Sequence, residues 1–245
     1  MNKFSVLMLV NRSDNRFEKA VESVIEQEPD EFCVYVDTRK VDVKDVKRVL
    51  KDANAVVSPQ IFNSAYSQQH NLVHNLHRGI LECNNEWVQR CDDDDELLGR
   101  NRRELIDEGF GIIHGDKLVD YGDRTKVQKS TQINDCNDLK HKRIFTGTAI
   151  LNREAFQKVH PLINHGYFCD WQIFYWILRA NYKAKYIPEV LYLQHANPNP
   201  SRERLKLYGT FPQVVDELNL VPDELLEYSK GIDSADWKYH FSFVE

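Results

Sequence analysis

The most constraining feature of this sequence is the alternation of apolar and amphipathic segments over roughly its first ninety residues. Short apolar runs, each of strand length, occupy residues 4–10, 31–37, 55–57 and 86–91. The segments between them carry apolar side chains at helical spacing, over residues 17–25, 43–50 and 68–83. Strands that alternate with helices form a mostly parallel sheet with helices on both faces. The sequence therefore predicts an α/β fold.

After residue 96 this alternation gives way to a less regular pattern. We expect a helix over residues 96–108, then several short strands, and an aromatic helix over residues 169–180. Two further strands, residues 184–187 and 190–194, are separated by Pro188 and Glu189. The last part, residues 202–245, has a helical pattern and is predicted to form a smaller C-terminal helical extension.

An unbroken acidic run directly follows the fourth apolar segment. It consists of Asp92, Asp93, Asp94, Asp95 and Glu96. A solvated surface run is the ordinary alternative, but this one lies between an apolar strand and two leucines, so it is expected beside the core. Crowded carboxylates there repel one another and need a counter-charge. Mg²⁺ and Mn²⁺ can supply it, because both prefer oxygen ligands.

The position of this run also predicts which side chains it meets. Alternate residues of an extended segment face the same way, so Asp92 and Asp94 are expected to face one site. Ligands of parallel α/β sheets gather at the carboxyl ends of the strands. Asp37 ends the second strand and is expected at the same edge, although an Asp there also suits an ordinary turn.

Two residues in the second half are weaker candidates. Asp170 opens the aromatic helix, where it can cap the helix or serve as a general base. His195 follows the last predicted strand, where it is either structural or a metal ligand. The local sequence alone favours the cap for Asp170 and a structural or exposed position for His195.

The composition excludes several classes of protein. The net charge is −6, so we expect no general nucleic-acid binding. No apolar stretch reaches the roughly eighteen residues that span a bilayer. The apolar start lacks a small-residue cleavage site and is better explained as a buried strand than as a signal peptide. We expect a cytoplasmic protein, or one peripheral at a membrane; its oligomeric state is not defined by the sequence.

The cysteines agree with a reducing compartment. There are five, an odd number, and no two are spaced as Cys-x-x-Cys. Their spacing therefore indicates neither a disulfide framework nor a zinc site. Cys33 and Cys91 lie in apolar runs and are expected to be core thiols.

Together these segments resemble the inverting glycosyltransferases of family 2, which have the GT-A fold. The resemblance covers about residues 4–202, and the order and spacing of the segments are more specific than any one motif. The residues that match the family's segments are Asn11, Asp37, Arg78, the acidic run, Gly147, Thr148, Asp170, Trp171 and His195. The resemblance implies a Rossmann-like GT-A domain over residues 1–201. Residues 1–98 would bind the nucleotide-sugar and residues 99–201 the acceptor.

The resemblance also implies roles on the donor side. Asp94 would bind Mn²⁺ or Mg²⁺ bridging the diphosphate, and His195 would be a further contact to that ion. The residues implied in contacts with the nucleotide part of the donor are Asn11, Asp37, Arg78, Asp92 and Asp93. A UDP-sugar is the expected donor.

On the acceptor side, the resemblance implies that Asp170 is the general base of a single, inverting displacement. Asp95, Gly147, Thr148 and Trp171 would lie against the sugar or the acceptor. The acceptor would be a carbohydrate, a lipid-linked molecule or another hydroxyl compound. The Gln-x-x-Arg-Trp motif of polymerising relatives is absent, so transfer of a single sugar is expected.

Three other functions stay open at this stage. A non-catalytic nucleotide-sugar-binding protein would fit Cys169, which stands where the family has a Glu. A nucleotidyltransferase is disfavoured because the loop after the first strand has no glycine. A glycosyltransferase acting on modified DNA would need a basic face. Arg100, Arg102 and Arg103 could form one, but we expect them on a solvated helix face.

Overall fold

The structure is a computed structural model that describes residues 2–62, 64, 68–140, 142, 144–163 and 169–196. The side chains of residues 68–70, 140 and 169–171 are not part of this description. The predicted helical extension over residues 202–245 lies outside the described residues. Among the helices that are described, none is both long and apolar enough to cross a membrane.

The first half forms the parallel sheet that the alternating pattern predicts. Its strands are β1 (Phe4–Val10), β2 (Glu31–Val36), β3 (Ala55–Pro59) and β4 (Trp87–Asp92). They pair in parallel in the order β3-β2-β1-β4. The connections contain α1 (Asn15–Glu26), α2 (Val43–Val49) and α3 (Gln68–Glu82). The carboxyl ends of β1, β2 and β4 therefore lie at one edge of the sheet.

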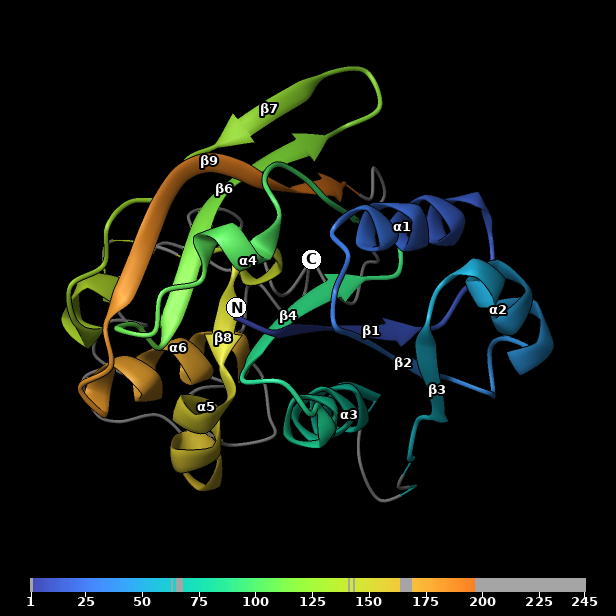
Figure 1. The fold of residues 1–245 in the computed structure, drawn as a ribbon, viewed down its shortest axis with the longest axis horizontal. Helices are drawn as coiled ribbons and strands as arrows, with labels where there is room; N and C mark the ends of the chain where they lie inside the picture. Colours follow the sequence, from blue (N-terminus) through green and yellow to red (C-terminus); the bar gives the residue numbers. More distant parts are fainter. Residues whose placement is uncertain are drawn as a thin grey trace.

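The second half extends this sheet with mixed strand directions. Beyond β4 the order is β8-β6-β9-β5, and β7 pairs with the outer part of β6. The strands are β5 (Glu96–Leu97), β6 (Ile112–Asp120), β7 (Thr125–Gln128), β8 (Ile150–Asn152) and β9 (Ala184–His195). The helices of this half are α4 (Arg102–Leu105), α5 (Arg153–Val159) and α6 (Cys169–Arg179). The central sheet is curled, as the ribbon shows (Figure 1).

Helices cover both faces of the sheet, because successive side chains of each buried strand point to opposite sides. In β1, Phe4, Val6 and Met8 pack with α1 and α2, whereas Leu7 and Leu9 pack with α3, α5 and α6. Figure 1 shows the corresponding layers, with α1 and α2 on one side of the sheet and α3, α5 and α6 on the other. The two cores fix β1 and β4 at the centre of the molecule.

The prediction of one helix over residues 96–108 is wrong. Glu96 and Leu97 instead form β5, which pairs antiparallel with Leu193 and Tyr192 of β9. Gly99 then takes a φ of +77°, which ends any local helix, and only the short α4 follows. Tertiary pairing with a strand about a hundred residues away outweighs the local helical pattern here.

The break expected in the last strand at Pro188 and Glu189 does not occur. The segments on either side of Pro188 and Glu189 form one continuous strand, β9. The pairing register of β9 with β6 shifts around Asp116, and this irregularity accommodates the proline. Since β9 is continuous, it reaches from the core to the edge of the sheet where β4 ends.

The expectation of a solvated arginine face over residues 100–103 is wrong for Arg102, although Arg100 is exposed. Arg100 pairs with Glu189, and Arg103 pairs with Asp30. Arg102 is fully buried. Its guanidinium donates to five acceptors: Gln89 Oε1, Gln27 Oε1 and the carbonyl oxygens of Leu98, Arg100 and Leu191. Arg102 thus joins β4, β9 and the end of α1 immediately behind the acidic run.

We predict that Arg102→Lys lowers the free energy of unfolding by about 3 kcal/mol, because an ammonium group cannot reach the five buried acceptors. Urea denaturation checks this. Arg100→Lys is the matched control, because its ion pair with Glu189 is exposed and its loss should change stability little. Equal effects of the two substitutions would contradict the structural role of Arg102.

Candidate functional site

The acidic run forms a tight turn at the end of the central strand. β4 ends at Asp92, and the backbone N–H of Asp95 donates to the carbonyl oxygen of Asp92 at 3.3 Å. We call residues 92–95 the acidic turn. It lies beside the carboxyl end of β1, because Leu9 is the register partner of Asp92. The sequence prediction of carboxylates at the carboxyl edge of the sheet is therefore confirmed in position.

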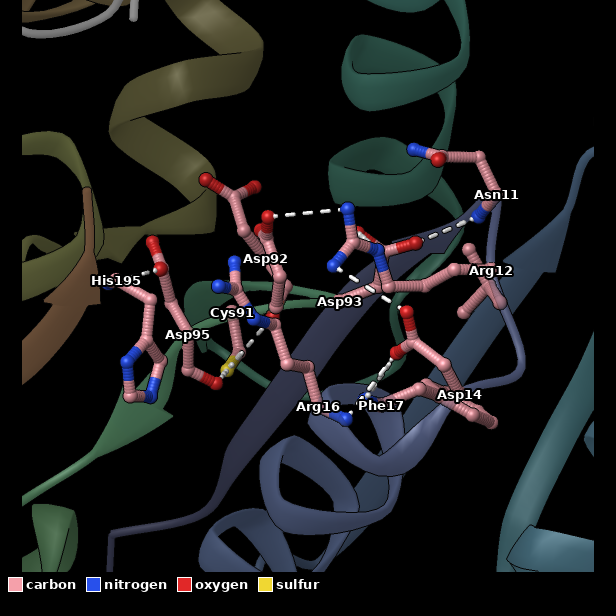
Figure 2. Close-up of polar contacts among 12 residues, drawn as sticks. Asn11, Arg12, Asp14, Arg16, Phe17, Cys91, Asp92, Asp93, Asp95 and His195 are labelled. Atoms are coloured by element: carbon pink, nitrogen blue, oxygen red, sulfur yellow. Dashed lines mark hydrogen bonds and ion pairs between the residues drawn. The ribbon is translucent and has the colours of Figure 1, made fainter. Parts of the chain in front are cut away.

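The loop between β1 and α1 holds one side of the acidic turn. The backbone N–H of Asn11 donates to Asp93 Oδ2 at 2.7 Å. Arg12 places its Nε 3.8 Å from Asp93 Oδ1 and its Nη2 3.3 Å from Asp94 Oδ2. Figure 2 shows Arg12 between the acidic turn and Asp14. Arg12 was not predicted as a site residue; only Asn11 of this loop was.

The end of β9 holds the other side. The backbone N–H of Asp92 donates to the Tyr192 hydroxyl oxygen at 3.2 Å, and the backbone N–H of His195 donates to Asp95 Oδ1 at 2.9 Å. The imidazole of His195 lies between two carboxylates. Its Nε2 is 2.9 Å from Glu96 Oε1, and its Nδ1 is 3.3 Å from Asp120 Oδ2. His195 thus meets the acidic turn, with both ring nitrogens already engaged.

Arg90 holds Asp92 from within the same strand. Its Nε donates to Asp92 Oδ1 at 2.7 Å. Arg90 also lines an apolar pocket between β4, α3 and α6, whose other lining residues are Leu76, Ile80, Val88, Thr146, Ala149, Leu151, Ile173 and Phe174. Arg90 was not predicted as a site residue, although alternation along a strand places it on the same face as Asp92.

The carboxylates of the acidic turn carry more negative charge than their surroundings compensate. Burial raises the pKa of Asp93 to about 7, and the charge of Asp94 adds to this effect. Burial also raises the pKa of Asp94 and Asp95, with a further contribution from Asp92. Additional positive charge would relieve this repulsion. A set of carboxylate oxygens with excess negative charge fits Mg²⁺ or Mn²⁺.

Asp37 lies at the same edge, as predicted. Its backbone N–H donates to the carbonyl oxygen of Val10, and its side chain is buried. Arg39 binds both carboxylate oxygens, with Nε at 3.0 Å and Nη2 at 2.9 Å. Burial raises the pKa of Asp37, but the hydrogen bonds from Arg39 outweigh it and hold the pKa below its usual value. Arg39 also stacks on Phe62, with its guanidinium carbon 3.2 Å from the ring centroid.

Arg78 lies farther along the same edge. It belongs to α3, where its Nε donates to Glu82 Oε1 at 2.8 Å and its Nη1 to the carbonyl oxygen of Pro59 at 3.3 Å. Pro59 is the last residue of β3. These contacts place Arg78 beside the carboxyl end of β3, and its contact with the nucleotide stays a prediction.

Gly147 and Thr148 lie in a short 3₁₀ turn, Thr146–Thr148, that contacts β4, where Gln89 Nε2 donates to the carbonyl oxygen of Gly147 at 2.8 Å. A side chain at Gly147 would overlap the ring of Tyr192, whose hydroxyl accepts from Asp92. Thr148 is fully buried, and its hydroxyl donates to the carbonyl oxygen of Phe145 at 2.9 Å. Gly147 therefore supports the site through Tyr192, while the hydroxyl of Thr148 is used within the fold.

The side chain of the predicted catalytic base, Asp170, is not described by the structure. Asp170 and Trp171 lie in the first turn of α6, but their side chains are outside the described part of the structure. Their roles stay predictions.

A second cluster of ligating side chains lies at the opposite edge of the sheet. Glu31, Cys33 and Cys83 bring a carboxylate oxygen and two thiol sulfurs within 4.8 Å of one another. Glu31 already accepts hydrogen bonds from the Ser5 hydroxyl and from the backbone and side chain of Asn84. Both thiols are buried, as expected for Cys33. Core packing and internal hydrogen bonds account for this cluster.

We predict that Gly147→Ala lowers the free energy of unfolding by roughly 1–3 kcal/mol, because the new methyl group displaces the Tyr192 ring. Urea denaturation measures the change. Gly109→Ala is the control, since a methyl group there meets its nearest neighbour, Asp107 Oδ1, at an ordinary 3.5 Å. A Gly147→Ala protein as stable as the control would show that Tyr192 is not packed as described.

Comparison with solved structures identifies the fold. TarS of S. aureus in complex with UDP has a TM-score of 0.62 and 14% identity, over 99% of this chain and 70% of that chain. TarS in complex with UDP-GlcNAc has a TM-score of 0.63 and 16% identity, over 99% and 71%. A mannosyltransferase from Pyrobaculum calidifontis, in complex with GDP-Man and Mn²⁺, has a TM-score of 0.62 and 13% identity, over 99% and 73%.

At 13–16% identity, these comparisons establish the fold. No protein-family model and no curated protein matches the chain. The chain has the mixed α/β architecture, with a curled central sheet, of GT-A-like glycosyltransferase structures.

Proposed function

We propose that this protein transfers a single sugar from a nucleoside diphosphate sugar to an acceptor hydroxyl, with a divalent cation bound at the acidic turn. The observation that carries this proposal is the gathering of the four carboxylates of residues 92–95 at the end of β4, on a GT-A-like fold. TarS and the mannosyltransferase support it, since their structures contain UDP or UDP-GlcNAc and GDP-Man with Mn²⁺, respectively.

Asp94 is the residue that we assign to the cation, Mn²⁺ or Mg²⁺. Its side chain is 31% exposed, whereas that of Asp93 is 6% exposed and is held by Asn11. His195 would join it if one ring nitrogen left Glu96 or Asp120. When bound, the cation would stabilise the negative charge that develops on the leaving diphosphate.

The protein's own groups would bind the rest of the donor. We assign the nucleotide to the edge formed by the ends of β1, β2 and β4, with Asn11, Asp37, Asp92 and Asp93, and with Arg78 farther along. Asp37 and Arg39 together present a carboxylate and a guanidinium that suit the polar edge of a base or a ribose. UDP-sugars are the first choice of donor. Residues 1–98 would form this donor half.

The acceptor would approach from the half formed by residues 99–201, where Gly147, Thr148 and Trp171 would line or support its site. Asp95 of the acidic turn would face it from the donor half. Asp170 would take the proton of the acceptor hydroxyl as that oxygen bonds to the anomeric carbon. The bond from this carbon to the diphosphate oxygen breaks in the same step, and the diphosphate leaves with the electron pair. A single displacement from the opposite face inverts the anomeric carbon, and carbohydrates or lipid-linked hydroxyl compounds are the acceptors we propose.

We predict that UDP or a UDP-sugar raises the melting temperature of the wild-type protein in Mn²⁺ and that EDTA abolishes this rise, because ligands that bind only the native state stabilise it. Asp94→Asn should lose the Mn²⁺-dependent part. Thermal denaturation against a panel of nucleotides measures both effects. Asp52→Asn, an exposed carboxylate far from the acidic turn in the chain, is the control and should behave as the wild type. A panel without any metal-dependent rise would contradict the proposed donor site.

We predict that Asp170→Asn keeps metal-dependent donor binding but loses transfer by at least about a hundredfold, since an amide cannot accept the proton. Donor binding is followed by calorimetry and transfer by release of the nucleoside diphosphate in the presence of an acceptor. Transfer at the wild-type rate by this variant would refute the assignment of the base. Binding without turnover in the wild type would instead favour a non-catalytic nucleotide-sugar-binding protein.

A further inference from the structure

Arg12 occupies the place where the acidic turn most needs positive charge. Its guanidinium lies 3.3 Å from Asp94 Oδ2 through Nη2 and 3.8 Å from Asp93 Oδ1 through Nε. Its Nη1 lies 3.8 Å from Asp14 Oδ2. Figure 2 shows these contacts converging on one guanidinium. Arg12 therefore neutralises in part the same carboxylates that we assign to the divalent cation.

The electrostatic effect of Arg12 on these carboxylates is direct. The guanidinium is 3.8 Å from Asp93 Oδ1 and 3.3 Å from Asp94 Oδ2, so its positive charge offsets part of the negative charge of both carboxylates. The side chain of Arg12 is 29% exposed, so solvent screens its charge only in part. Arg12 therefore supplies, from within the chain, part of the positive charge that these crowded carboxylates need.

The contacts of Arg12 are long enough for its guanidinium to move away from the acidic turn. Charge-assisted N–H···O bonds are typically about 2.7–2.9 Å long, and all three contacts of Arg12 are longer. The main-chain contact that fixes the turn comes instead from Asn11, at 2.7 Å. Asp14 caps α1 with its other oxygen, so the neighbouring anchor of Arg12 stays in place when the acidic turn changes partners. Arg12 can thus move without unfolding its surroundings.

We propose that Arg12 is the resident counter-ion of the acidic turn, that it competes with the divalent cation for Asp93 and Asp94, and that it turns to the donor diphosphate when the cation binds. This inference rests on the proposed function. A guanidinium suits phosphate oxygens as well as it suits carboxylates. Arg12 would thus weaken the binding of metal alone and strengthen the binding of nucleoside diphosphate in the presence of metal.

The test compares wild type, Arg12→Gln and Arg16→Gln in two titrations. Free Mn²⁺ is first measured by electron paramagnetic resonance as the protein is titrated with Mn²⁺ alone. UDP, and GDP separately, are then titrated calorimetrically at saturating Mn²⁺. Arg16 is the matched control: it is exposed on α1 and acts on Asp94 through its charge, without an ion pair to the acidic turn among the described residues.

We expect Arg12→Gln to bind Mn²⁺ alone roughly tenfold more tightly than the wild type and to bind the nucleoside diphosphate roughly tenfold more weakly, in the usual range of coupling between two sites. Arg16→Gln should change both affinities much less. The opposite signs matter, because a purely structural role of Arg12 would weaken both. Arg12→Lys keeps the charge, so both of its affinities should lie between those of the wild type and those of Arg12→Gln. This variant serves as the test if Arg12→Gln fails to fold.

The outcomes separate this inference from the proposed function. If the wild type binds Mn²⁺ with UDP or GDP but Arg12→Gln binds Mn²⁺ alone no more tightly, the competition is refuted and the proposed function stands. An equal gain in Mn²⁺ affinity for Arg16→Gln would likewise refute it, since general charge would then explain the effect. If no variant binds Mn²⁺ or nucleoside diphosphate, the proposed function and this inference both fail.

Discussion

Repulsion among adjacent carboxylates at the end of a buried strand is the constraint on which the rest of this structure depends. Asp93 and Asp95 are almost fully buried, and burial raises the pKa of both. Such a turn persists only where donors and cations surround it. The chain supplies backbone N–H groups from Asn11 and His195 and a guanidinium from Arg12. The charge that is still uncompensated is what makes this edge of the sheet suited to a metal ion.

The fold serves this turn by bringing its two supports together from distant parts of the chain. β1 lies beside β4 on one side, and the loop after it delivers Asn11 and Arg12. β9 arrives from the second half of the chain and delivers Tyr192 and His195. Arg102, buried behind the turn, joins β4 to β9. The parallel half of the sheet therefore presents the carboxylates, and the mixed half holds them in place.

The parts of the fold with a local signal could be predicted from the sequence. β1 to β4 alternate with helices, so their parallel pairing and the position of the acidic turn at the carboxyl edge of the sheet could be predicted from periodicity, whereas the strand order β3-β2-β1-β4 was not predicted. The structure of residues 96–108 could not be predicted from periodicity, because β5 forms by pairing with β9, which is distant in the sequence. Arg102 was assigned to a solvated face because the acceptors that bury it come from β4, β9 and the end of α1. Three arginines of the site were not predicted: Arg12, Arg39 and Arg90. Each stands two residues from an Asp in the sequence, a spacing that is common on any protein surface.

The most direct test of the central claim is a crystal of this protein grown with Mn²⁺ and UDP, measured for anomalous scattering at the manganese edge. We predict one strong anomalous peak beside the carboxylate of Asp94, with the UDP diphosphate next to it and the guanidinium of Arg12 moved away from the acidic turn. A manganese peak elsewhere, or UDP bound with no manganese at the acidic turn, would contradict this claim.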